Sequence, residues 1–280
     1  MRSSMDDTFA LTDIDLLDKN AGRRFLDFYG DAGIRLGLER YGFVERLLER
    51  GWTDLRIEAH ALDDRHTLLI DGTAEDGTEG RLIELVVRRD RLRIEGFERI
   101  WDVLTVDWLS LRNPLGEFTP DRMRLPGQDA PGLGIGERVL ELLYRLVSRL
   151  DLDGLVNVAE YFHNAALYSR EMVYADPWYQ GQLEALEELL FWREGLTFPQ
   201  AAWAVHWGHV RDEGEPFCWR GEALVGAREE TLKEHLHSRD HRRRARQVRR
   251  ALDLTLEREA FDAQWERDEG SLLEAPTQPG

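Results

Sequence analysis

The sequence contains little cysteine and no long apolar run, and both shortages restrict the class of protein. The single Cys218 has no partner for an internal disulfide, and a zinc site built from several cysteines is excluded. No run of about 18 apolar residues occurs, which predicts that no segment spans a membrane. Residues 1–20 are acidic and include no apolar core of signal-peptide length. We therefore expect a cytoplasmic protein without a membrane partner.

Positive charge is also in short supply. The chain has 37 Lys and Arg residues against 54 Asp and Glu residues, which gives a formal net charge of -17 at pH 7. A field of this sign repels polyanions, so it argues against nucleic acid as a partner. One basic block, RDHRRRARQVRR at residues 239–250, opposes the trend. Because acids flank this block on both sides, we expect its arginines to pair along or between helices and to form a solvated helix face.

Several motifs of enzyme chemistry are missing as well. The chain has no G-x-S-x-G nucleophile motif, and its glycine-rich stretch at 131–136 lacks the Lys and Ser/Thr of a P-loop. His206 and His209 share one helix face, but no acid stands between them as it does in a zinc-protease helix. These histidines interleave with tryptophans, so we interpret them as parts of a packed helix pair and expect no metal.

Hydrophobic periodicity divides the 280 residues into a mixed α and β part and a helical part. Helices are predicted over 34–48, 135–150 and 161–170, and strands over 55–59, 65–72, 81–89, 102–111, 154–159 and 172–175. After Pro177 the pattern is helical, with helices predicted over 178–192, from a Thr197 cap onward, and over 228–268. The order predicts an α+β fold, with a mixed, largely antiparallel sheet flanked by helices and an α-helical C-terminal extension. The expected organisation is a lead-in at 1–33, an α+β domain at 34–176, the extension at 177–270 and a disordered tail at 271–280.

Three glycines alternate with apolar residues in PGLGIG, residues 131–136, directly before the strongest predicted helix. The first amides of a helix have no intrahelical acceptor, and the helix macrodipole adds partial positive charge at that end. Gly132, Gly134 and Gly136 carry no Cβ that would keep a bulky phosphate away, and they permit positive φ. The turn therefore predicts a diphosphate-binding site, and the alternative is a flexible entry to a buried helix.

This segment resembles the GCN5-related N-acetyltransferase (GNAT) family. In that family a strand leads to a loop of pattern R-G-x-G-x-G, which opens a long helix and binds the pyrophosphate of acetyl-coenzyme A. A strand, a short helix containing L-Y and a final strand follow. Here PGLGIG stands at 131–136, the predicted strand at 154–159 and HNAALY at 163–168. The resemblance covers roughly residues 34–176.

The resemblance implies an enzyme that transfers an acetyl group from acetyl-coenzyme A to an amine acceptor, either a small molecule or a peptide. Tyr168 is similar to the family's general acid, and strand 102–111 would admit the pantetheine arm. Asp107 and Glu160 are the candidates for the base that takes the proton of the amine. The coenzyme-binding residues implied by the resemblance are Leu109, Leu111, Gly132, Leu133, Gly134, Ile135, Gly136 and Asn164.

The chain departs from the family pattern at two places. Pro131 stands where the family usually has Gln or Arg, and Met172 and Val173 stand where it has Gly-Phe. These departures favour a second hypothesis, in which a GNAT-like fold persists as a catalytically inactive binding module. Its tryptophan-rich helical extension would then dock a protein partner.

Overall fold

The computed structural model describes residues 24–276, and the chain divides into two compact units. The first comprises Met1–Arg88 with Trp108–Ser110, and the second comprises Arg89–Asp107 with Leu111–Gly280. Most of the lead-in predicted at 1–33 lies outside the described residues. None of the helices in the described part combines the length and the apolar character that crossing a bilayer requires.

The first unit is built on an antiparallel meander. Its elements are α2 (Asp31–Arg40), α3 (Phe43–Leu48), β1 (Trp52–Leu62), β2 (Arg65–Ala74) and the first part of β3 (Glu79–Arg93). In the paired strands, Ile70 of β2 lies opposite both Ile57 of β1 and Ile83 of β3. Buried and half-buried positions alternate along β2, which is why a period of two identified it. The helical stretch predicted over 34–48 forms two helices, α2 and α3, and the three predicted strands are confirmed.

The second unit contains a parallel pair of strands joined by a helix. Its elements up to residue 174 are the end of β3, β4 (Ile100–Leu111), α4 (Gly136–Arg149), β5 (Gly154–Val158), α5 (Phe162–Tyr168) and β6 (Val173–Tyr174). β4 and β5 pair in parallel from Val103 with Gly154 to Val106 with Asn157, and α4 supplies the crossover that a parallel pair requires. The structure has a seven-stranded sheet in the order β1-β2-β3-β4-β5-β9-β6. The predicted α+β class, with a mixed and largely antiparallel sheet, is confirmed.

The region after Pro177 contains the expected helices, but it is not purely helical. Its elements are α6 (Pro177–Glu187), the π-helix η1 (Glu188–Arg193), α7 (Phe198–His206), β7 (Val210–Asp212), β8 (Glu215–Pro216), β9 (Ala223–Ala227), α8 (Glu230–Leu236), α9 (Arg239–Ala251), β10 (Leu254–Leu256), α10 (Arg258–Asp268) and the 3-10 helix η2 (Glu269–Leu273). β9 enters the main sheet between β5 and β6 and runs antiparallel to both. β10, β7 and β8 form a separate small sheet. These strands have two to five residues, too few to show a period of two, and part of the predicted tail is the ordered η2.

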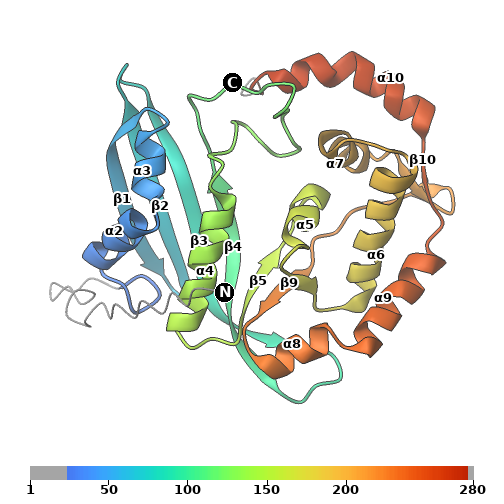
Figure 1. The fold of residues 1–280 in the computed structure, drawn as a ribbon, viewed down its shortest axis with the longest axis horizontal. Helices are drawn as coiled ribbons and strands as arrows, with labels where there is room; N and C mark the ends of the chain where they lie inside the picture. The colour runs from blue at the N-terminus through green and yellow to red at the C-terminus, as the bar shows by residue number, and fades with distance from the viewer. Residues whose placement is uncertain (1–23, 277–280) are drawn as a thin grey trace, which may run out of the picture. The chain divides into compact units, whose positions relative to one another are not determined.

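Local signals in this region did identify two features correctly. The capping box at the start of α7 is present, with the Thr197 and Gln200 side chains bonded reciprocally to backbone amides. The stretch 178–192 is helical, as α6 continued by η1. α6 packs closely along α9 (Figure 1), and Gly181 makes this possible because an added Cβ would lie 2.5 Å from the carbonyl oxygen of Ala245.

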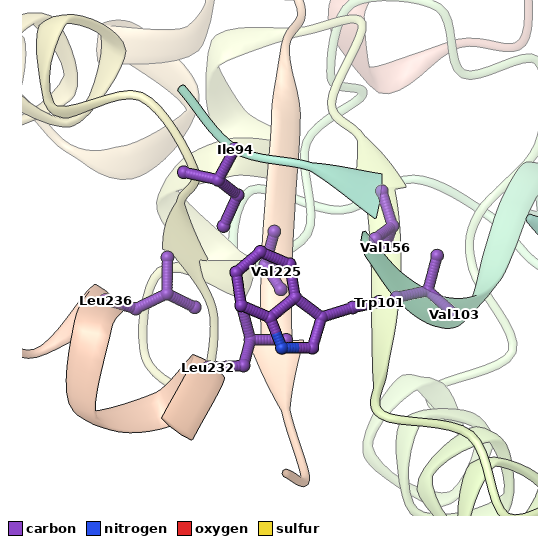
Figure 2. Close-up of a cluster of buried hydrophobic side chains, with 7 residues drawn as sticks. All are labelled: Ile94, Trp101, Val103, Val156, Val225, Leu232 and Leu236. Carbon is purple, nitrogen blue, oxygen red and sulfur yellow. The ribbon is translucent and has the colours of Figure 1, made fainter. Parts of the chain in front are cut away.

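A hydrophobic cluster joins the strands of the second unit to α8 (Figure 2). The ring of Trp101, at the start of β4, lies among aliphatic side chains from β5, β9 and α8 and is 0% exposed. Burying an aromatic side chain of this size removes a large apolar area from water. The members of the cluster are Ile94, Trp101, Val103, Val156, Val225, Leu232 and Leu236.

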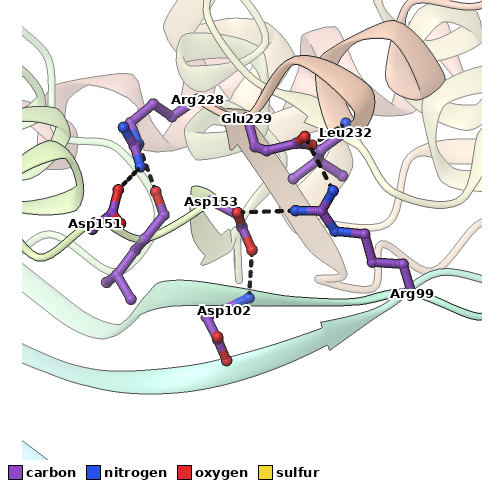
Figure 3. Close-up of polar contacts among 8 residues, drawn as sticks. Arg99, Asp102, Asp151, Asp153, Arg228, Glu229 and Leu232 are labelled. Atoms are coloured by element: carbon purple, nitrogen blue, oxygen red, sulfur yellow. Dashed lines mark hydrogen bonds and ion pairs between the residues drawn. The ribbon is translucent and has the colours of Figure 1, made fainter.

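Polar contacts fix the amino-terminal ends of the two parallel strands (Figure 3). Asp153, just before β5, accepts a hydrogen bond from the backbone N of Asp102 in β4 at 2.8 Å. Its carbonyl accepts from the amides of Arg228 and Glu229, which follow β9, at 2.8 Å each. Arg99 lies 3.5 Å from Asp153 and 3.2 Å from Glu229. This network connects β4, β5 and the β9–α8 turn at one edge of the sheet. The carboxyl ends of the two parallel strands lie at the opposite edge, where loops follow them.

Candidate functional site

The glycine turn lies directly before α4 and leaves backbone donors open. α4 begins at Gly136 with Ile135 as its N-cap residue, and no side chain caps it. Among the described residues, no acceptor takes a hydrogen bond from the amides of Gly134, Ile135 or Gly136. The side chains of Leu133 and Ile135 are 0% and 1% exposed, so the core holds the turn in place. Gly134 and Gly136 are exposed, so their amides are available to an external anion, whereas Ile135 is buried as a whole residue.

The three glycines of the turn have different surroundings. Gly134 has φ 68°, a left-handed conformation that favours glycine over any residue with a Cβ. An added Cβ at Gly136 would meet no atom within 4 Å, so the space beside it is open. Gly132 forms an antiparallel bridge with Arg112, next to a 2.7 Å bond from the amide of Asn113 to the carbonyl of Pro131. Gly132 thus belongs to the pairing that fixes the turn, and Gly134 and Gly136 line its open side.

The loop at 112–131 carries the turn and is held by distant parts of the chain. The guanidinium of Arg122 donates to the carbonyl of Gly132 at 2.8 Å. The amide of Arg124 donates to Leu272 O at 3.0 Å, and its carbonyl accepts from the Trp203 indole at 2.7 Å. α7 and η2 therefore fix the loop from outside. The contacts of Arg124 with Trp203 and Leu272 join residues more than 70 positions apart, so no local pattern predicts them.

The topology brings the turn and the start of α5 to one edge of the sheet. β4 and β5 run parallel, so their carboxyl ends lie at the same edge. α4 returns antiparallel to these strands, which places its first turn at that edge, and α5 starts there after β5. In sheets with parallel strands, ligands bind in the crevice outside the carboxyl ends. The turn and α5 are therefore positioned where the fold favours a ligand.

α5 presents two of the predicted site residues. Asn164 and Tyr168 are four positions apart on this helix, so they share a face. Both are half-buried, and no described residue makes a hydrogen bond to the Tyr168 hydroxyl. Burial raises the pKa of Tyr168 above its usual value near 10, because it disfavours the charged phenolate. Tyr168 therefore keeps its proton throughout the neutral range.

The remaining predicted residues lie near the ends of the parallel strands. Asp107 in β4 and Glu160 just after β5 are both exposed carboxylates. Leu109 and Leu111 are half-buried at the end of β4. Leu109 belongs to the segment Trp108–Ser110 of the first unit. All the other candidate residues belong to the second unit.

A histidine and aromatic cluster at the start of α5 was not predicted as part of the site. His163 is buried, and its ring stacks on Tyr161 with centroids 5.5 Å apart. Burial, with a smaller contribution from His206, lowers the pKa of His163 to about 4, so the ring is neutral at pH 7. Tyr161 also packs on Gly127 of the loop, where an added Cβ would lie 2.7 Å from the ring. The available signal was the position of His163 at the start of the short helix that follows β5.

His206 and His209, the pair noted in the sequence, pack against other side chains of the C-terminal region. The ring centroids of His206 and Trp203 lie 5.3 Å apart, and His209 Nε2 donates to Gln264 Oε1 of α10 at 2.8 Å. Trp207 packs on Phe261 of α10. The packed helix pair predicted for this stretch is therefore present. Within residues 24–276, no group of three His, Cys, Asp or Glu side chains is placed to hold a metal ion.

A cavity of about 580 Å³ lies elsewhere in the second unit. It is lined by the segment after β3, the β6–α6 junction and residues of α8 and α9, and it contains none of the predicted site residues. Both arginines and carboxylates face it, among them Arg93, Glu95, Glu222 and Arg244, so its charge selects no single class of ligand.

No protein-family model, no curated protein and no solved structure was found to match this chain.

Proposed function

We propose that this chain is an N-acetyltransferase that uses acetyl-coenzyme A and acts on an amine acceptor. The observation that carries the proposal is the set of three unpaired amides, of Gly134, Ile135 and Gly136, at the start of α4. Helix-start amides of this kind bind phosphate groups through hydrogen bonds and the helix dipole. Each hydrogen bond to a charged acceptor contributes roughly 1.5–3 kcal/mol, so bonds from the exposed Gly134 and Gly136 bind a phosphate group without a lysine.

The arrangement around the turn supports this ligand over a bare phosphate. The order of strand, glycine turn, long helix, parallel strand and short helix with a tyrosine matches the order that the GNAT resemblance requires. The exposed Gly136 leaves room for a bulky group beside the helix start. Leu111 offers apolar surface at the end of β4 for the pantetheine arm.

When bound, acetyl-coenzyme A supplies an activated acetyl group, which forms a new C–N bond with the amine as the C–S bond breaks. Tyr168, which keeps its proton at neutral pH, donates it to the departing sulfur. Asp107 or Glu160 takes the proton that the attacking amine loses. The net charge of -17 raises the local concentration of cationic amines, which favours them as acceptors.

Thermal unfolding with and without acetyl-coenzyme A tests this proposal. A ligand at 100 times its dissociation constant stabilises the folded state by about 2.7 kcal/mol. For a domain of this size, that is about 5–10 °C in melting temperature. An unchanged melting temperature at millimolar coenzyme would refute the proposal.

A binding module without catalysis is the second candidate, and one observation favours it. Trp192, on the π-helix η1, is 84% exposed, and large exposed aromatic side chains are enriched where proteins dock. The same titration separates the two functions, because a module with an unused turn would show no stabilisation by acetyl-coenzyme A.

A further inference from the structure

The outer face of α9 carries the main concentration of positive charge in the sequence. Residues 239–250 include seven arginines and one aspartate, a charge of +6 with His241 neutral, whereas the whole chain carries -17. The rest of the chain therefore carries -23. The opposite face of α9 is buried, with His241 3% and Ala245 1% exposed, and it packs on α6. Arg239, Arg246 and Arg250 are exposed, whereas Arg244 lines the cavity described above and Arg249 is half-buried.

The acids that flank this block in sequence do not neutralise it. Glu229 pairs with Arg99 at 3.2 Å, and Glu257 pairs with Arg211 at 2.8 Å, so both are engaged outside α9. Asp240 forms ion pairs with Arg243 and Arg244 of the same helix. Glu188 of η1 forms an ion pair with Arg249. The expected pairing along and between helices is therefore present for Arg243, Arg244 and Arg249, but it does not extend to the whole block. In the described part of the chain, no carboxylate lies within ion-pair distance of Arg239, Arg246 or Arg250.

Arg242 has no carboxylate partner either, but it donates to the carbonyls of His237 and Ser238. The remaining three, Arg239, Arg246 and Arg250, form one stripe. At 3.6 residues per turn, positions 239, 246 and 250 fall within about 40° of one another around the helix, and a rise of 1.5 Å per residue gives a stripe of about 16 Å. All three side chains belong to exposed residues. A guanidinium binds a carboxylate through two parallel hydrogen bonds, which makes arginine well suited to acidic side chains.

We propose that this stripe docks a short acidic segment of a partner protein. An extended segment of about five residues spans 16 Å, which matches the three arginines. The charge of the remaining chain decides against nucleic acid. A longer polyanion that extends beyond the stripe would be repelled by the net charge of -23 on the rest of the chain, whereas a short segment contacts α9 alone.

The test measures binding of a fluorescein-labelled octapeptide of glutamate by fluorescence anisotropy at 50 and 200 mM salt. The triple variant Arg239→Gln, Arg246→Gln and Arg250→Gln should bind at least tenfold more weakly than the unmodified protein at 50 mM salt. Binding to the unmodified protein should weaken with salt, because the contacts are exposed and electrostatic.

The matched control removes three arginines that are already paired. Arg46, Arg145 and Arg267 form ion pairs at 2.6, 2.7 and 2.9 Å with acids close in sequence, so their change to Gln alters the net charge by the same three units. This control should bind the peptide within about twofold of the unmodified protein. Equal weakening in both triple variants would show an effect of overall charge and overturn the proposal.

Two other results would also overturn it. One is the absence of peptide binding to the unmodified protein at millimolar peptide and 50 mM salt. The other is tighter binding of an eight-nucleotide single-stranded DNA than of the octapeptide, because that result assigns the stripe to nucleic acid. If the triple variant fails to fold by circular dichroism, the single variant Arg246→Gln replaces it, with an expected two- to threefold weakening and Arg267→Gln as its control.

Discussion

Gly136 offers a way to separate the stability of α4 from its proposed binding role. The residue is the first of the helix, and a Cβ added there meets no atom within 4 Å. Gly136→Ala should therefore fold without strain. Because alanine loses less conformational entropy than glycine in a helix, we expect a gain of about 0.5 kcal/mol in the free energy of unfolding. For this chain length, that is about 1–2 °C in melting temperature.

Ligand binding should change in the opposite direction. The added methyl group occupies the open space beside an amide that has no protein acceptor. If a diphosphate oxygen binds that amide, the variant loses most of one hydrogen bond to a charged acceptor, roughly 1.5–3 kcal/mol, or about 10- to 100-fold in the dissociation constant. Isothermal titration calorimetry with coenzyme A measures this loss, and thermal unfolding measures the gain in stability.

The matched control is Gly37→Ala in α2. An added Cβ at Gly37 also meets no atom within 4 Å, but the residue belongs to the first unit. This variant should gain similar stability and bind coenzyme A unchanged. The reasoning about the glycine turn is refuted if Gly136→Ala is as stable as expected and still binds coenzyme A with the affinity of the unmodified protein.

Three further outcomes are expected. Tyr168→Phe should lower the turnover of acetyl transfer by about 10²- to 10⁴-fold, the usual range for loss of a general acid, while coenzyme affinity stays within twofold; unchanged turnover would remove the tyrosine from its role. His163 has a folded-state pKa of about 4 against 6.5 unfolded, so the unfolded chain binds more protons between these values and stability falls as the pH drops from 6.5 to 4. The pH dependence of the urea midpoint should therefore be shallower in His163→Phe, and an equal slope contradicts the buried neutral ring. Leu272→Ala removes a buried side chain, 2% exposed, and should release the loop at 112–131 from η2. Trypsin should then cut after Arg122 and Arg124 faster than in the unmodified protein. Equal cleavage would show that η2 does not hold the loop.

Long periodic segments could be predicted from the sequence because their burial pattern is local. β2 and β3 alternate buried and half-buried residues, and α4 buries Val139, Leu143 and Leu146 on one stripe. The glycine turn could be predicted as well, because it depends only on glycines next to a helix start. In each case, one stretch of sequence contains all the information.

Features that depend on distant contacts could not be predicted. β9 reads ALVGA, five small or apolar residues without alternation, and it is a strand only because β5 and β6 bond to its two edges. The charge on α9 shows the same limit. Acids such as Glu229 and Glu257 are near in sequence, but the fold directs them to Arg99 and Arg211. Nearness in sequence therefore does not tell which acids pair with the arginines of α9.

The position of β9 also changes the relation between the C-terminal region and the candidate site. β5 pairs with β4 on one side and with β9 on the other, from Gly154 with Ala227 to Val158 with Ala223. Without β9, the backbone groups of β5 that face it would lose their partners inside the second unit, and buried groups of this kind are costly to leave unpaired. α7 and η2 in addition hold the loop that carries the glycine turn. Residues after 177 are therefore part of the structure that positions the turn and Tyr168. The α9 helix and the glycine turn belong to the same compact unit, the second one.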